Sequence, residues 1–121
     1  MSSVRLALIT LFAAVITGCG DYEIPLRHGY LLGRISSDTF VLVDPSKRIV
    51  VGPTVDSCQV VGDLFIGRVS RDDGQQSYFI VDMRSRNVHR DLSETEWRRQ
   101  LAAKGVTDFR LVRPTRSVTF T

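Results

Sequence analysis

The chain has few of the residues that metal sites and disulfide scaffolds need. Its 121 residues include only two cysteines, Cys19 and Cys58, and two histidines, His28 and His89. Structural zinc sites take four closely spaced Cys or His ligands, and small secreted scaffolds use several cysteine pairs. The sequence also contains no CxxC pair, no Walker loop, no dinucleotide fingerprint and no GxSxG motif. It therefore predicts no metal site, no cofactor and no catalytic residue of these kinds.

Lysine is scarce as well, with 2 lysines beside 14 arginines, and the net charge is only +3. Charges of both signs are spread along the chain, which does not favour binding to nucleic acid. We therefore predict no nucleic-acid partner. The excess of arginine reflects either coding composition or a use of bidentate contacts to carboxylate or phosphate.

Long apolar runs are absent except near the N-terminus, where residues 6–16 read LALITLFAAVI. Eleven residues are too few to span a hydrocarbon core of about 30 Å as a helix. Arg5 precedes the run and small residues follow it, which is the pattern of a secretory signal peptide. We therefore expect residues 1–18 to be a signal peptide.

The residues at 16–19, ITGC, resemble the lipobox of bacterial lipoproteins. The resemblance implies that Cys19 carries a diacylglyceryl group on its sulfur, becomes the first residue after cleavage, and anchors the protein by acyl chains such as palmitate. Asp21 stands one place beyond the position where Asp favours the inner membrane, so the resemblance implies an outer-membrane lipoprotein that faces the periplasm. The alternatives are a Gram-positive cell surface, an N-terminal membrane helix, or a chance cysteine after a signal peptide.

Beyond Cys19 the sequence predicts a short tether and one globular domain. Residues 19–28 contain Pro25 and form the tether, residues 29–113 form the domain, and residues 114–121 form a loose tail. Such a tether reaches at most about 30 Å, which keeps the domain close to the bilayer.

Short runs rich in Val, Ile, Phe and Tyr predict β-strands. Turns at Gly62-Asp63 and at residues 72–74 are short enough to favour an antiparallel meander. The stretches FVLVDPSKRIVV and YFIVDMRSRNVH form a faint repeat, in which Asp44 and Asp82 each precede an arginine by four residues and are expected to form Asx-type turns. The expected strands are residues 30–35, 40–43, 49–51, 58–61, 64–69 and 78–81, with residues 109–112 as one more strand that Pro114 ends.

One helix is expected in the stretch DLSETEWRRQLAAKGV. Ser93 is its N-cap, Glu96 completes a capping box, and Leu92 and Trp97 occupy the hydrophobic-staple positions. Gly105 ends the helix. Several strands are apolar on both faces, so the sheet needs cover, and this helix supplies some of it. The predicted fold class is α+β, mainly β, with an antiparallel meander sheet and one C-terminal helix packed on it.

The densest group of like charges consists of five arginines near the end of the domain. They form either a solvated face that is partly paired with nearby acidic residues, or a contact for an acidic partner or for lipid headgroups. The five residues are Arg84, Arg86, Arg90, Arg98 and Arg99.

The stretches GYLLGRIS, VVGDLFIGRV, YFIVDMRSRNV and LSETEW are similar to a family of small bacterial lipoproteins that carries a domain of unknown function. The resemblance implies no activity, and Arg86 departs from it because a turn glycine is expected there. We expect a lipid-anchored envelope protein that acts as a small binding or accessory module for a protein partner, with an inhibitor or immunity protein as the specific form.

Two alternatives are a self-associating envelope component and an enzyme subunit. The enzyme reading requires a cleft that joins His28 or His89 to a carboxylate. Cys58 lies in an apolar run and is expected to be buried, with an intermolecular disulfide or a reactive thiol as the alternatives.

Overall fold

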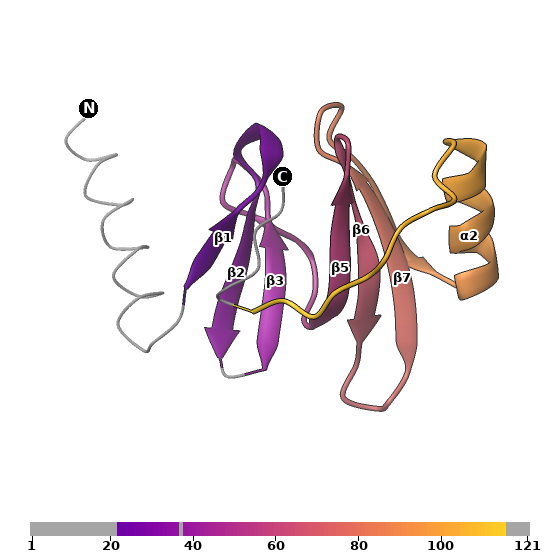
Figure 1. The fold of residues 1–121 in the computed structure, drawn as a ribbon. Helices are drawn as coiled ribbons and strands as arrows, with labels where there is room; N and C mark the ends of the chain where they lie inside the picture. The colour runs from indigo at the N-terminus through magenta and orange to yellow at the C-terminus, as the bar shows by residue number, and fades with distance from the viewer. Residues whose placement is uncertain (1–21, 37, 116–121) are drawn as a thin grey trace.

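The computed structural model describes residues 22–36 and 38–115, so the predicted signal peptide and Cys19 lie outside the described residues. The described strands form two four-stranded antiparallel sheets, and an α-helix follows them in the chain. N-terminal sheet, C-terminal sheet and helix succeed one another across the molecule as three layers (Figure 1). The predicted fold class is confirmed, and the meander is divided between two sheets.

The N-terminal sheet has the strand order β1-β2-β3-β4. Its strands are β1 Glu23–Pro25, β2 Leu31–Ser36, β3 Thr39–Val43 and β4 Ile49–Val51. β1 corrects the predicted tether, because Ile24 is buried and opposes Leu32 of β2. A short 3-10 turn at Arg27–Gly29 joins β1 to β2. Residues expected to form a tether therefore belong in part to the folded domain.

The C-terminal sheet has the order β5-β6-β7-β8. Its strands are β5 Val55–Val61, β6 Leu64–Ser70, β7 Gln76–Asp82 and β8 Asn87–Leu92. The predicted turn at Gly62-Asp63 joins β5 to β6, and the predicted turn at residues 72–74 lies between β6 and β7. β8 is not among the predicted strands, because NVHRDL contains few residues that favour strands.

The larger core lies between the two sheets. Leu32 and Leu42 of the N-terminal sheet and Phe65 and Phe79 of the C-terminal sheet belong to it and are fully buried. Within the C-terminal sheet, Gly67 lets β6 lie close to β5, because a Cβ at that position would overlap the Ser57 carbonyl oxygen. Burying these side chains supplies most of the hydrophobic stabilisation of the sandwich.

A second core lies on the other face of the C-terminal sheet, under helix α2 Glu94–Ala103. Trp97 and Leu101 of the helix pack there against Ile66 and Ile80. Phe65 and Ile66 of β6 face different cores, and so do Phe79 and Ile80 of β7. The expectation that strands apolar on both faces need cover is therefore confirmed for β6 and β7.

The predicted signals at the helix ends are largely confirmed. The Ser93 hydroxyl accepts the Glu96 N–H at 3.2 Å, and Leu92 and Trp97 share one cluster. Gly105 has φ +78, the left-handed conformation expected at a helix end. The described contacts of the Glu96 carboxylate are with Arg99 and Gln100, so the second half of the capping box is not seen among them.

The segment after the helix crosses the open edge of β5 (Figure 1). Val112 and Cys58 exchange two backbone hydrogen bonds of 2.9 Å, while the strand predicted at residues 109–112 is reduced to this single bridge. Pro114 is buried, so the predicted tail begins as part of the domain, and residues 116–121 lie outside the described residues. No helix in the described ranges is long and apolar enough to cross a bilayer.

Candidate functional site

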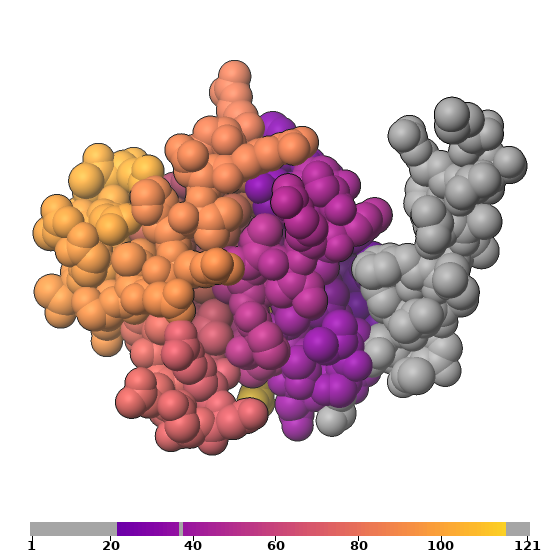
Figure 2. Space-filling model, turned by 180° about the vertical axis from the view of Figure 1, so that it is seen from behind, coloured from indigo at the N-terminus to yellow at the C-terminus, as the bar shows by residue number. Residues whose placement is uncertain are grey.

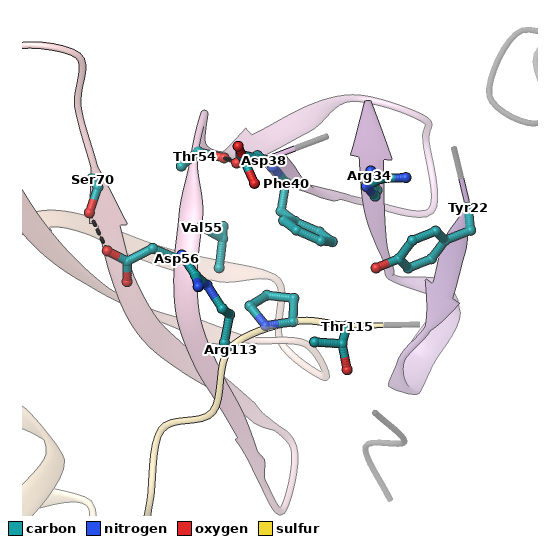
Figure 3. Close-up of a pocket in the computed structure, with 11 residues that line it drawn as sticks. Tyr22, Arg34, Asp38, Phe40, Thr54, Val55, Asp56, Ser70, Arg113 and Thr115 are labelled. Atoms are coloured by element: carbon teal, nitrogen blue, oxygen red, sulfur yellow. Dashed lines mark hydrogen bonds between the residues drawn. The ribbon is translucent and has the colours of Figure 1, made fainter. Parts of the chain in front are cut away.

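A pocket of about 580 Å³ lies between the two sheets and is called the inter-sheet pocket below. Figure 3 shows side chains from both sheets and from the C-terminal segment around it. Its lining combines two aromatic rings with arginines and aspartates, which suits a ligand with both apolar and charged groups. The lining residues are Tyr22, Arg34, Asp38, Phe40, Thr54, Val55, Asp56, Ser70, Arg113, Pro114 and Thr115.

The N-terminal sheet supplies the aromatic wall of the inter-sheet pocket. The Tyr22 and Phe40 rings meet edge to face, with centroids 6.1 Å apart. The Arg34 guanidinium lies over the Tyr22 ring, 5.5 Å from its centroid. Arg34 opposes Phe40 in the register of β2 and β3, so one strand pair positions both side chains.

Thr54 connects the two sheets beside the inter-sheet pocket. Its backbone exchanges hydrogen bonds of 3.0 and 3.2 Å with Ser70 of β6. Its hydroxyl accepts the Phe40 N–H at 2.7 Å and donates to the Asp38 carbonyl at 3.0 Å, as Figure 3 shows for Asp38. The wall of the pocket is thereby held by hydrogen bonds from both sheets.

Asp56 carries the negative charge on the other side of the pocket. Its carboxylate accepts the Arg68 Nε–H at 2.9 Å and the hydroxyl of Ser70. The hydrogen bond to Asp56 raises the pKa of Arg68 above its ordinary value, and burial acts in the opposite direction. Asp56 is therefore compensated within the fold, while Arg113 from the C-terminal segment adds a cation to the rim.

A second hollow, of about 440 Å³, lies at another edge of the sandwich, where β4 and β8 meet. We call it the arginine groove, because Arg48, Arg86 and Arg90 line it together with Asp44 and Tyr30. Residues near 48–50, in magenta, lie beside residues near 86–90, in orange, in the view of Figure 2. The Arg90 Nη1 donates to the Val50 carbonyl at 2.9 Å and joins the two edges.

The predicted arginine cluster is only partly brought together. Arg86 and Arg90 line the arginine groove, whereas Arg84 is exposed on the preceding turn. Arg98 and Arg99 lie on α2 and pair with glutamates of the same helix, Glu94 at 3.0 Å and Glu96. Hydrogen bonds from Arg99 and then Gln100 lower the pKa of Glu96 to about 2.

Sequence reasoning missed Arg48 as a partner of Arg86 and Arg90. The repeat contains the signal, because Arg48 and Arg86 each stand four residues after an aspartate that forms a turn. Asp44 Oδ1 accepts the Ser46 N–H and Asp82 Oδ1 accepts the Arg84 N–H, so the predicted Asx-type turns are confirmed. The fold places the two hairpins side by side, which a repeat alone does not show.

His28 contacts a carboxylate, which is one part of what the enzyme alternative requires. Its Nε2 lies 2.9 Å from Asp63 Oδ1, and Arg27 lies 4.0 Å from the same oxygen. His28 and Asp63 do not line either pocket described above. His89 is exposed on β8, and the described residues contain no group of three or more side chains able to hold a metal ion.

Cys58 is fully buried and unpaired by any disulfide, as the sequence predicts. Burial, and to a lesser degree the Asp56 carboxylate, raises the pKa of its thiol to about 12. The thiol is therefore protonated and shielded, which does not suit a nucleophile.

No protein-family model, curated protein or solved structure matches the chain. The lipobox and the similarity to small bacterial lipoproteins therefore stay predictions.

Proposed function

We propose that this chain is a lipid-anchored protein of the bacterial envelope that acts as a binding module, with the inter-sheet pocket held at the membrane surface. One observation carries the proposal: Tyr22 lines the pocket and stands only three residues after Cys19. Three residues span at most about 10 Å even when fully extended. An acylated Cys19 would therefore keep the mouth of the pocket next to the headgroups.

The placement of β1 supports this arrangement. Tyr22 accepts the Arg34 N–H through its carbonyl oxygen at 2.9 Å, so this residue is already part of the N-terminal sheet's hydrogen bonding. A domain attached this closely has little freedom to leave the bilayer, and its pocket meets partners that are themselves at the membrane. We expect outer-membrane attachment on the periplasmic side, as the position of Asp21 implies.

The partner we propose is a protein of the envelope, and an inhibitor or immunity protein is the specific form. This choice follows from the size of the domain and its predicted location, together with a pocket that mixes aromatic and charged groups.

Photo-crosslinking from two positions in the anchored protein tests the proposal. A photoreactive phenylalanine derivative replaces Asp38, at the rim of the inter-sheet pocket, or Thr95, exposed on α2. Irradiation of intact cells should give a discrete adduct from position 38 and none from position 95. The adduct should disappear when Cys19→Ser is combined with position 38. Equal adducts from both positions, or none from position 38, would contradict the proposal.

Self-association is a second candidate, favoured by two exposed isoleucines on the N-terminal sheet. Ile35 and Ile49 keep 45% and 55% of their surface exposed. Sedimentation of the detergent-solubilised protein distinguishes this role, because a dimer built on this face should dissociate in Ile35→Ser and Ile49→Ser.

A further inference from the structure

The arginine groove gathers three cations from two separate hairpins. Arg48 follows the turn between β3 and β4, whereas Arg86 and Arg90 come from the β7–β8 hairpin. The three side chains converge on one hollow at the edge of the sandwich. We propose that this groove is a binding site for the phosphate group of a phosphate monoester.

The charges that line the groove do not cancel. Three guanidinium groups face one carboxylate, that of Asp44. Asp44 Oδ1 already accepts the N–H groups of Ser46 and Arg48 at 2.9 Å, so this carboxylate is engaged in its own turn. Within residues 22–36 and 38–115, no carboxylate lies within ion-pair distance of Arg86 or Arg90. The groove therefore offers a net charge near +2 to an anion.

One of the three arginines is held in place before any ligand binds. Arg90 is held by its 2.9 Å hydrogen bond to the Val50 carbonyl, whereas Arg48 is largely exposed and its Nε lies 3.7 Å from Asp44 Oδ2. Val50 and Val88 form the apolar part of the lining. Preorganised donors lose less conformational entropy on binding than free arginines do.

Tyr30 adds a donor to the groove, and Arg86 reaches it from a strained turn position. Tyr30 lines the groove, and burial, followed by the Asp44 carboxylate, raises its pKa, so the hydroxyl keeps its proton. Arg86 has φ +66, a conformation that glycine adopts without strain and arginine does not. The sequence therefore has a guanidinium at a turn position where the backbone favours glycine.

The number and charge of the donors favour phosphate over a single carboxylate. A phosphate monoester carries nearly two negative charges and three terminal oxygens, and the planar guanidinium group pairs with such oxygens through two parallel hydrogen bonds. Two sources share this chemistry: a soluble phosphorylated metabolite, and the headgroup of a lipid such as phosphatidic acid.

Binding measurements on the full-length lipidated protein in nonionic detergent test the site. Glycerol 3-phosphate is titrated by calorimetry, and the second arm titrates short-chain phosphatidic acid, with short-chain phosphatidylcholine as its control, in the same detergent. Saturable binding in the first arm identifies a soluble ligand, and binding only in the second arm identifies a headgroup. Either result supports the phosphate site, and the absence of both overturns it.

Matched variants separate the groove from general electrostatics. Arg86→Gln and Arg90→Gln should each weaken binding by about tenfold or more, because each removes a charge-assisted contact. Arg84→Gln removes the same charge from the same hairpin but outside the groove, and it should change the affinity by less than about twofold. Thermal unfolding confirms that each variant is folded. Equal losses in all three variants would overturn the proposal.

Discussion

The indole Nε1 of Trp97 donates a 2.9 Å hydrogen bond to the main-chain carbonyl of Phe79. This bond fastens α2 to the middle of the C-terminal sheet, and the same indole packs against Tyr78 and Phe109 at centroid distances of 4.7 and 5.4 Å. One side chain therefore joins the helix, the sheet and the C-terminal segment.

Replacing Trp97 should therefore destabilise the domain strongly. Trp97→Ala is expected to lower the free energy of unfolding by about 3–5 kcal/mol, because it empties part of the second core. Trp97→Phe should cost less, about 1–3 kcal/mol, since it leaves the Phe79 carbonyl without its partner. Chemical denaturation measures both, with exposed Thr95→Ala as the control. A Trp97→Ala variant as stable as that control would show that the Trp97 contacts do not stabilise the domain.

The helix was well predicted because its determinants are local. Ser93, Trp97 and Gly105 act within a few residues of one another, so the sequence shows the cap, the buried face and the end together. The Asx-type turns at Asp44 and Asp82 are local in the same way. β1 is different, because three residues become a strand only when β2 pairs with them.

The division into two sheets and the candidate sites could not be predicted from local pattern. The chain passes from β4 of one sheet to β5 of the other at Gly52 and Pro53, a pair that is typical of a break between strands but does not indicate a change of sheet. The arginine groove depends on that crossing, because it brings Arg48 beside Arg86 although 38 positions separate them. Contacts of this kind follow from tertiary packing rather than from spacing.

Substitution by alanine should change stability very differently at two glycines, one in each sheet. Gly67→Ala places a Cβ against the Ser57 carbonyl oxygen and 2.9 Å from Cys58 Cα, so it should lower the free energy of unfolding by at least about 1–3 kcal/mol. Gly33→Ala is the matched control, because its nearest neighbour would be Val41 at 3.9 Å. Denaturant titration compares the two variants, and similar stabilities would show that β5 and β6 do not approach as closely as described.

Arg86→Gly should make the protein more stable while weakening its groove. Relief of the left-handed backbone at φ +66 is expected to raise the free energy of unfolding by about 1 kcal/mol. Phosphate binding should fall at the same time, because a groove cation is lost. Arg84 has no positive φ, so Arg84→Gly should give no such gain in stability when both variants are compared by thermal unfolding. A loss of stability in Arg86→Gly would refute the strain at this turn.

Cys58 should make the fold sensitive to alkaline pH. Its pKa is about 12 in the folded protein and 9.0 ordinarily. Between these values the unfolded chain binds fewer protons than the folded one, so stability is complete below pH 9 and falls as pH rises toward 12, by up to about 4 kcal/mol. Denaturation of the wild type and of Cys58→Ala at several pH values measures the effect. The variant, although less stable at neutral pH, should show a flatter decline, and parallel curves would count against a buried thiol.

The mass of the mature N-terminal peptide is the most direct test of anchorage at Cys19. The protein is expressed in a bacterial host that carries the lipoprotein-processing enzymes, extracted in detergent and digested, and the first peptide is sequenced by mass spectrometry. We predict a chain that begins at Cys19 with a diacylglyceryl group on the sulfur, and an unprocessed precursor for Cys19→Ser. A wild-type chain that retains Met1, or that begins at Cys19 with an unmodified thiol, would contradict a lipid anchor beside the inter-sheet pocket.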